Sequence, residues 1–152
     1  MRSEAMAIAA LWTEAYVTDG VGGRAEPYGK EDFLVADRDG EVFVCDGEGG
    51  LAGVVVLYPP GAPGRAVARA GEAELSRLAV TRPARGRGLG RALAAFCTDC
   101  ARERGWDSIV LWSRAAQVEA HRLYESLGYR RLPERDSVDG SGLARLVFRM
   151  RL

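Results

Sequence analysis

The chain has 152 residues, 28% of them charged and 47% hydrophobic, and its 21 basic and 21 acidic side chains give a formal net charge of zero. This length is typical of one domain, residues 1–152, with a hydrophobic core of its own. The neutral balance argues against nucleic acid as a partner, because proteins that bind it usually carry a basic excess. No stretch approaches the roughly 18 apolar residues of a membrane span, and no basic-then-apolar signal opens the chain, so we expect a cytoplasmic protein without membrane association.

Hydrophobic spacing and turn residues predict helices and an antiparallel hairpin in the first half of the chain. In chain order we expect a helix over 2–18, a loop over 19–30, a short helix over 31–38, strands over 41–45 and 51–58, and a flexible connection over 59–71. The two strands flank the run Asp46-Gly47-Glu48-Gly49-Gly50, and such turn-forming residues between β-rich segments favour a hairpin.

The second half of the chain alternates strand and helix patterns. We expect a strand over 72–80, a helix over 88–104, a strand over 107–113, a helix over 115–127, and strands over 129–132 and 143–149 around a polar loop at 133–142. A crossover through a helix makes the strands that it joins parallel. The sequence therefore predicts an α/β or α+β fold whose antiparallel front leads into a central parallel pair.

A turn rich in glycine and arginine joins the strand over 72–80 to the helix over 88–104. It consists of Arg85, Gly86, Arg87, Gly88, Leu89, Gly90 and Arg91. A glycine-rich turn at a helix start leaves backbone N–H groups free, and the helix dipole adds partial positive charge at the same place. Ligands of strand–helix–strand units also lie beyond the carboxyl ends of the strands. We expect a phosphate group to bind here.

Three phosphate-binding motifs compete for this turn. A Walker A loop requires Lys-Ser or Lys-Thr after the glycines, and neither pair follows Gly90. A dinucleotide-binding fingerprint requires the spacing G-x-G-x-x-G, whereas Gly86, Gly88 and Gly90 are spaced G-x-G-x-G. The third motif is the Q/R-x-x-G-x-G/A signature of the GNAT family of N-acetyltransferases, which Arg85-x-x-Gly88-x-Gly90 matches.

The resemblance to the GNAT family extends on both sides of the turn. Upstream, the segment from Glu74 to Val80 resembles the fourth strand of the family. Downstream, Gln117-x-x-Ala120-x-x-Leu123-Tyr124-x-x-x-Gly128-Tyr129 resembles its last helix and the turn that follows. The family motif usually begins with Asn, so Gln117 is a departure. The similarity covers 72–129, extends over 41–150, and is thin before residue 40.

This resemblance implies the acyl-CoA N-acyltransferase fold, a mixed and mostly antiparallel sheet of six or seven strands with a central parallel pair and about four flanking helices. Family members usually begin with a strand before the first helix, whereas this chain starts almost inside that helix. The first strand is therefore either absent or upstream of this sequence. Many relatives are homodimers, so a homodimer stays open.

The resemblance also implies acetyl-CoA as the acyl donor and no metal. Its pyrophosphate would lie on the backbone N–H groups from Arg85 to Arg91, and a Cβ at Gly88 or Gly90 would block that approach. Leu78, Ala79 and Val80 would pair their main-chain groups with the pantetheine arm, as an added strand does. A backbone N–H near Leu78 would hold the thioester oxygen. Gln117 would hydrogen-bond the pantetheine.

The reaction so implied is direct attack of a neutral amine on the thioester. Tyr124 occupies the place of the family's proton-donating tyrosine, although it also lies on the apolar face of its helix. Glu74 is the candidate base, acting directly or through water, and Glu72 on the same strand face is the alternative. His121 lies four residues from both Gln117 and Glu125, which predicts that it faces outward.

The three cysteines give no sign of redox or metal chemistry. Cys97 and Cys100 form a C-x-x-C in the middle of a predicted helix and on its apolar face. A redox pair of cysteines is expected at a helix N-terminus. A zinc ion would need ligands beyond these two cysteines, and the chain has a single histidine, His121. Core packing is the favoured interpretation, with no metal.

The acceptor amine is not defined by the sequence. It would be selected by the first helix and its loop and by the loops 59–71 and 133–142, whose charges are mixed. A small amine, an amino acid, an antibiotic or a protein N-terminus all stay open. The alternative functions are a non-catalytic acyl-CoA-binding sensor or regulatory module on the same fold, and RNA binding through the arginine-rich turn.

Overall fold

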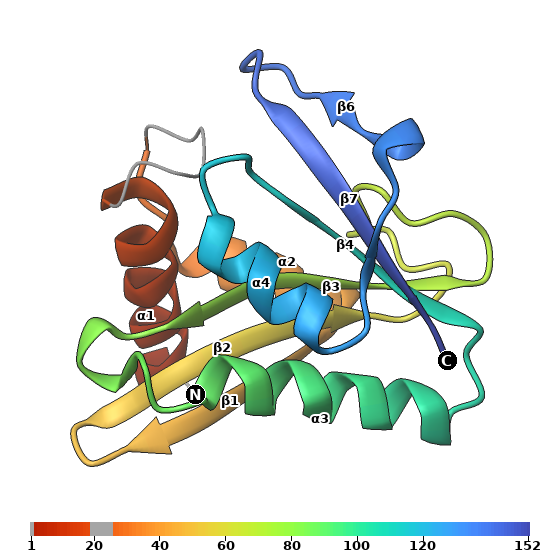
Figure 1. Cartoon of the computed structure of the whole chain (residues 1–152). Helices are drawn as coiled ribbons and strands as arrows, with labels where there is room; N and C mark the ends of the chain where they lie inside the picture. Colours follow the sequence, from red (N-terminus) through yellow and green to blue (C-terminus); the bar gives the residue numbers. More distant parts are fainter. Residues whose placement is uncertain (1, 19–25) are drawn as a thin grey trace.

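In the computed structural model, which describes residues 2–18 and 26–152, one mixed sheet separates two layers of helices (Figure 1). The helices are α1 (Arg2–Thr13), α2 (Lys30–Asp39), α3 (Leu89–Glu103) and α4 (Val118–Ser126). The strands are β1 (Glu41–Gly47), β2 (Gly50–Tyr58), β3 (Glu72–Val80), β4 (Ser108–Ser113), β5 (Arg130–Arg131), β6 (Ser137–Val138) and β7 (Ala144–Arg151). A π-helical turn, Glu14–Thr18, continues α1. None of the helices in these ranges is long and apolar enough to cross a membrane.

The sheet has the strand order β1-β2-β3-β4-β7-β5, and β6 pairs with β7. Every pairing is antiparallel except that of β3 with β4, which is parallel. The predicted mixed sheet with a central parallel pair is therefore confirmed. Seven strands lie within the described residues. The short β6, inside the segment predicted as a polar loop, was not expected.

Two hydrophobic clusters hold the helices on opposite faces of the sheet. Under α3 and α4 lie Leu93, Ala94, Cys97 and Ala101, spaced so that they share one face of α3, together with strand residues such as Phe148. The other face carries α1 and α2 over a second cluster that contains Ile8, Trp12, Ala36 and Val54. Fully burying each large apolar side chain contributes about 1.5–3 kcal/mol, so both layers are firmly anchored to the sheet.

The parallel pair separates soon after it begins, and this separation creates the site. β3 and β4 pair only over Glu72–Glu74 and Ser108–Val110, although each strand continues beyond that point. In Figure 1 the two strands diverge toward the side where α1 and α4 lie. β4 keeps its partner β7 up to Ser113. The carboxyl-terminal part of β3 therefore has one edge without a neighbouring strand.

A β-bulge in β3 changes which residues face each helical layer. The register with β2 shifts between Val54 and Val56, and Arg77 has a positive φ of 50°, which is unusual for a residue with a Cβ. Before the bulge the odd-numbered Leu75 packs in the cluster under α3, and after it the even-numbered Leu78 does so. The bulge thus places Arg77 on the opposite face, toward α1.

Two sequence predictions of local structure were wrong. Helix α4 starts at Val118 and not at 115, because the Oε1 atom of Gln117 accepts hydrogen bonds from Ser113 Oγ (3.0 Å) and from the N–H of Arg114 (2.9 Å), which fixes a turn first. The segment 59–71, predicted as a flexible connection, is tied to the sheet by the side chains described below.

Candidate functional site

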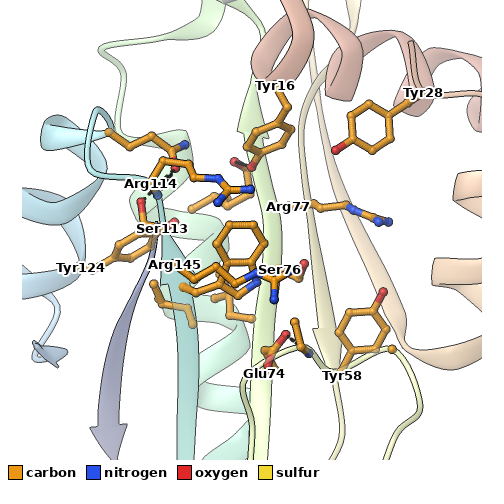
Figure 2. A pocket seen from close by; sticks show the side chains of 17 residues that line it. Tyr16, Tyr28, Tyr58, Glu74, Ser76, Arg77, Ser113, Arg114, Tyr124 and Arg145 are labelled. Carbon is orange, nitrogen blue, oxygen red and sulfur yellow. Dashed lines mark hydrogen bonds between the residues drawn. The ribbon is translucent and has the colours of Figure 1, made fainter. Parts of the chain in front are cut away.

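A cavity of about 250 Å³ opens where β3 and β4 separate. Its walls come from both helical layers, since Tyr16 and Tyr28 lie on one side and Tyr124 of α4 on the other (Figure 2). The remaining aromatic and charged lining residues are Tyr58, Glu74, Arg77, Trp112, Arg114 and Arg145. Of the predicted site residues, Tyr124, Glu74, Leu78 and Gln117 all line this cavity.

The open edge of β3 belongs to Leu78 and Val80. The N–H of Thr81 donates to the carbonyl of Ala52 on β2 (2.8 Å). Because main-chain groups alternate along a strand, those of Ala79 also face β2, whereas those of Leu78 and Val80 face the gap. Of the three residues predicted to pair with a pantetheine arm, only two therefore present their main chain to it.

The carbonyl groups on this edge are already engaged by side chains. The hydroxyl of Tyr16 donates to the carbonyl of Leu78 (2.7 Å), and Nε of Arg85 donates to that of Val80 (3.0 Å). Burial raises the pKa of Tyr16 well above its ordinary value, with smaller effects from neighbouring tyrosines. Tyr16 therefore stays a neutral donor that fixes the edge of the strand.

The glycine-rich turn lies between the end of β3 and the start of α3. Gly86 and Gly88 have φ values of 78° and 81°, a left-handed conformation that disfavours other residues. No side chain caps the N-terminus of α3, so no capping side chain competes with a ligand for the first N–H groups of the helix. Gly90 differs, since an added Cβ would meet its nearest neighbour at an ordinary 3.6 Å. That a Cβ at Gly90 would block the approach of a pyrophosphate stays a prediction, because this neighbour belongs to the protein and not to the ligand.

Three exposed arginines surround this turn. Arg85 and Arg87 lie within it, and Arg91 follows one residue after Gly90. Arg91 hydrogen-bonds the hydroxyl of Ser126 on α4. The positive charge and the N–H groups thus lie at one end of the gap, as the sequence predicted for an anion site.

Tyr124 projects from α4 into the cavity and is 8% exposed. Its ring packs against those of Tyr129 and Phe148, with centroids 5.8 Å and 6.1 Å away. Burial raises its pKa well above the ordinary value, so the phenol stays protonated. Among the described residues its hydroxyl has no hydrogen-bond partner. It is thus a neutral proton donor directed at the cavity.

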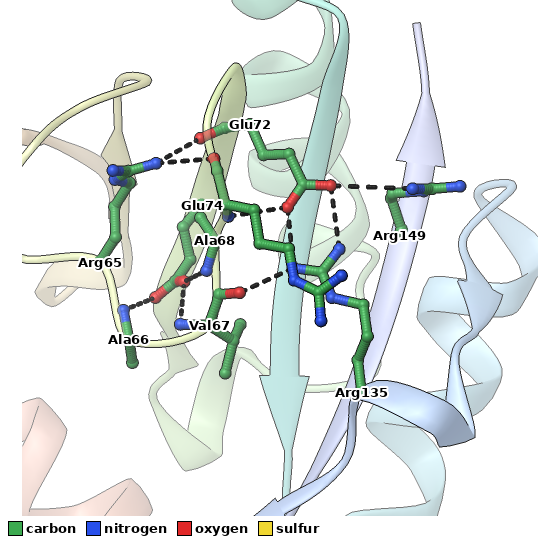
Figure 3. A network of polar contacts seen from close by, with 9 residues as sticks. Arg65, Ala66, Val67, Ala68, Glu72, Glu74, Arg135 and Arg149 are labelled. Atoms are coloured by element: carbon green, nitrogen blue, oxygen red, sulfur yellow. Dashed lines mark hydrogen bonds and ion pairs between the residues drawn. The ribbon is translucent and has the colours of Figure 1, made fainter.

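Glu74 is almost fully buried, and its carboxylate fastens the segment 59–71 to the sheet (Figure 3). Oε1 accepts hydrogen bonds from the N–H groups of Val67 (2.7 Å) and Ala68 (2.8 Å), and Oε2 accepts one from Ala66 (2.8 Å). A carboxylate offers about four acceptor positions. One position on Oε2 is left for a further donor, and Glu74 lines the cavity.

Glu72, two residues earlier on the same strand, faces different partners (Figure 3). Both of its oxygens accept hydrogen bonds from Arg135 (2.8 and 3.0 Å), the N–H of Arg69 donates to Oε1 (2.9 Å), and Arg149 lies 3.8 Å away. Burial raises its pKa, but the hydrogen bonds and the charges of the two arginines outweigh this effect, so that the pKa is lowered. Glu72 is not among the residues that line the cavity.

The end of β4 carries a small polar cluster. His121 packs its ring on Phe148, with centroids 5.2 Å apart, and its Nε2 lies 3.2 Å from Ser113 Oγ and 2.9 Å from the carbonyl of Arg114. The prediction that His121 faces outward is therefore wrong. The i±4 spacing identifies Gln117 and Glu125 as neighbours of His121 on one face of the helix. It does not reveal that this face contacts β4.

Three arginines in the cavity walls were not identified as site residues from the sequence. Arg77 comes from the bulge of β3, Arg114 follows β4, and Arg145 lies on β7. Such residues are hard to find by pattern, because the chain carries 21 basic side chains and most lie on the surface. Only the positive φ at Arg77 marks one of them as special, and φ cannot be read from a sequence.

The C-x-x-C pair is part of the α3 layer. Cys97 is buried in the core cluster, and Cys100 packs against it. Burial, with smaller effects from neighbouring groups, raises the pKa of Cys97 to about 12. Within residues 2–18 and 26–152, no group of three or more His, Cys, Asp or Glu side chains is arranged to bind a metal ion.

Comparisons with known proteins agree with this architecture. The family model of the acetyltransferase (GNAT) family matches residues 6–129. The N-acetylaspartate synthetase of Danio rerio is 36% identical over 83 residues, which cover 51% of this chain and 29% of the relative. N-acetyltransferase 8 of Rattus norvegicus is 30% identical over 102 residues, which cover 66% of this chain and 44% of the relative. The matches thus span less than half the length of these curated relatives.

Solved structures share the fold. The ribosomal-protein-alanine N-acetyltransferase of Brucella melitensis gives a TM-score of 0.77 at 24% identity, covering 100% of this chain and 96% of the other. A GNAT family acetyltransferase of Elizabethkingia anophelis with acetyl-CoA bound gives a TM-score of 0.62 at 18% identity, covering 82% and 84%. At these identities the likeness establishes the fold alone.

Proposed function

Because the chain belongs to the GNAT family of acetyltransferases, we propose that it transfers the acetyl group of acetyl-CoA directly to a primary amine. The observation that supports this most is the cavity between β3 and β4, which has a buried neutral tyrosine on one wall and is lined by Leu78 of β3, the strand that leads to the glycine turn of an uncapped helix. The comparisons do not define the acceptor, since the proteins that this chain resembles carry names as different as N-acetylaspartate synthetase and ribosomal-protein-alanine N-acetyltransferase.

Acetyl-CoA, when bound, supplies an acetyl group activated as a thioester. The residues present fit it in three places. The open edge of β3 at Leu78 and Val80 offers N–H groups to an amide-rich arm, because Tyr16 and Arg85 already engage its carbonyl groups. The N–H groups from Gly86 to Gly90 offer donors to a pyrophosphate, with Arg85, Arg87 and Arg91 adding charge. The amide NH₂ of Gln117 is free to donate, because Oε1 carries its other contacts.

We assign Tyr124 the role of general acid toward the departing thiolate. Its buried phenol stays protonated, as the raised pKa indicates. A phenol gives its proton to a thiolate, whose acid has a pKa near 8.5, only as negative charge develops beside it. The hydroxyl has no competing partner among the described residues, so it is available to the sulfur.

We assign Glu74 the role of base, acting through water. Three backbone N–H groups stabilise its carboxylate, and only one acceptor position on Oε2 is left. A water hydrogen-bonded at that position would accept the amine proton and pass one of its own to Oε2 of Glu74. Glu72 is the weaker candidate, because Arg135 and the N–H of Arg69 already occupy its oxygens outside the cavity.

The first test is thermal unfolding of the full chain with acetyl-CoA, with ATP and NAD as controls. At a hundredfold excess over Kd, binding adds about 2.7 kcal/mol, which is roughly 5–10 °C for a domain of this size. Release of the CoA thiol with a panel of amines then measures transfer. Equal shifts with all three nucleotides would contradict the donor site. A specific shift without turnover on any amine would favour the non-catalytic acyl-CoA-binding module.

A further inference from the structure

We propose that the acceptor is a small dicarboxylic amino acid, bound through its carboxylates by Arg77 and Arg145. This inference rests on the proposed function, since it names the substrate class of the same cavity. Both arginines line the cavity, and neither guanidinium has a carboxylate partner among the described residues. Figure 2 shows Arg77 on the side of Tyr28 and Arg145 nearer the opposite wall.

Arg77 is held in place without being neutralised. Its guanidinium carbon lies 5.0 Å from the ring centroid of Trp12 and 5.5 Å from that of Tyr28. Those rings orient the side chain but leave its N–H donors free for an anion. The residue also adopts the left-handed conformation, which is costly for a side chain with a Cβ. Strain at a cavity wall is typical of a functional position.

Arg145 reaches the cavity from β7, nearer the wall opposite Tyr28 (Figure 2). Its guanidinium carbon lies 5.0 Å from the ring centroid of Trp112, and its Nε is buried without a hydrogen-bond partner. A buried donor without a partner is unfavourable, and a ligand carboxylate would supply one. Arginine offers paired N–H groups that match the two oxygens of a carboxylate.

Arg114, which also lines the cavity, differs from Arg77 and Arg145 in having a carboxylate partner. It also lies over the Trp112 ring, at 4.7 Å, but it is paired with Asp139 and donates to the carbonyls of Leu143 and Ala144. Its charge is thus balanced by the protein. The charged lining residues are three arginines and Glu74. With Arg114 balanced by Asp139, Arg77 and Arg145 against Glu74 leave an excess of one positive charge, which the single net negative charge of a dicarboxylic amino acid with a protonated amine would neutralise.

The size of the cavity restricts the acceptor further. Its volume of about 250 Å³ is below the roughly 300–1,000 Å³ of pockets that enclose drug-sized ligands. A free amino acid is therefore a better match than an antibiotic. A polyamine is disfavoured as well, because its extra charges would face the arginines. With its carboxylates on the two arginines, a dicarboxylic amino acid would place its amine near Glu74.

The test measures binding and turnover in parallel with the full chain. Aspartate and glutamate are titrated calorimetrically into the complex with CoA. Asparagine and glutamine lack the side-chain carboxylate, and the diamides of aspartate and glutamate lack both carboxylates, so the series separates the two groups. We expect aspartate or glutamate to bind at least about tenfold more tightly than its diamide, the usual effect of a charge-assisted hydrogen bond. Equal binding of the diamide, or no binding of either acid, overturns the inference.

Variants then assign the effect to the two residues. Arg77→Gln and Arg145→Gln should each raise the KM for the preferred acid about 10- to 100-fold while the KM for acetyl-CoA stays constant. Arg102→Gln, an exposed substitution on α3, is the matched control. An unchanged acid KM in both cavity variants contradicts the assignment. Because acetyl-CoA binding is measured separately by thermal shift, loss of the proposed function is distinguished from a wrong acceptor.

Discussion

The two halves of the site are built from different parts of the chain. The proposed donor half consists of the open edge of β3 and the turn 85–91, where backbone groups and positive φ values would create the binding surface. The proposed acceptor half is the cavity, whose walls are side chains from segments far apart in the chain, among them the turn after α1, β2, β3, β4, α4 and β7. In the first half the backbone conformation matters most, and in the second the identity of each side chain.

This difference predicts how each half responds to substitution. Backbone groups recognise what every acyl-CoA shares, so the donor half should tolerate side-chain changes and fail when the turn cannot form. Side chains in the acceptor half act one by one, so their removal should change selectivity or rate while donor binding persists. The following substitutions are arranged from the largest expected effect on activity to the smallest.

Gly88→Val should abolish acetyl-CoA binding. Gly88 has a φ of 81°, and a β-branched residue there costs about 1–2 kcal/mol in strain and shifts the turn. The thermal shift by acetyl-CoA measures the loss. Gly105→Val is the matched control, because Gly105 also has a positive φ (70°) but follows the far end of α3. If Gly105→Val lost the shift as well, general destabilisation and not the phosphate turn would explain the effect.

Tyr124→Phe should lower kcat by about 10²- to 10⁴-fold, the range typical of general acid catalysis, with the Kd for acetyl-CoA unchanged. Tyr129→Phe is the control. Tyr129 is also buried, and its ring centroid lies 5.8 Å from that of Tyr124, but it is not among the residues that line the cavity. Steady-state kinetics and the thermal shift separate the two quantities. Equal rates in both variants would remove Tyr124 from the mechanism.

Glu74→Gln should lower kcat/KM by about 10- to 100-fold, most strongly at low pH, where more of the amine is protonated. The substitution also removes an acceptor from the N–H groups at 66–68, so a loss of about 1–3 kcal/mol in stability is expected. The pH profile of kcat/KM distinguishes the two roles. A uniform decrease at every pH would mean that Glu74 only positions the segment 59–71.

The same division explains what the sequence could predict. The donor half follows from local rules, since a strand, a glycine turn and a helix adjoin in the chain, and β3 and α3 were predicted almost to the residue. The acceptor half depends on packing between distant segments. That Arg77 faces the cavity results from a bulge, and that His121 turns inward results from contacts with β4. Neither orientation produces a periodic pattern in the sequence, because each concerns the position of a single side chain.

Glu72 lies on the same strand as Glu74 but does not line the cavity, so we expect its substitution to change stability and not the chemistry. The side chain of its partner Arg135 is 6% exposed, and removing one member of a buried ion pair leaves the other uncompensated. Glu72→Gln should therefore cost about 3 kcal/mol of stability, or roughly 6–12 °C in Tm. The pH profile of kcat/KM should keep its shape, in contrast to Glu74→Gln.

The stability loss in Glu72→Gln has a defined pH dependence. Because the pKa of Glu72 is lower in the folded protein than in the unfolded chain, its contribution is complete above the unfolded value near 4.3. It declines as the pH falls toward the folded pKa. The Tm difference between the wild type and Glu72→Gln should thus be constant from pH 5 to 8 and shrink below about pH 4. A difference that persisted undiminished at pH 3 would mean that shape, and not the carboxylate charge, holds Arg135 in place. A change in the shape of the rate profile would instead bring Glu72 into the chemistry and remove the distinction between the two glutamates of β3.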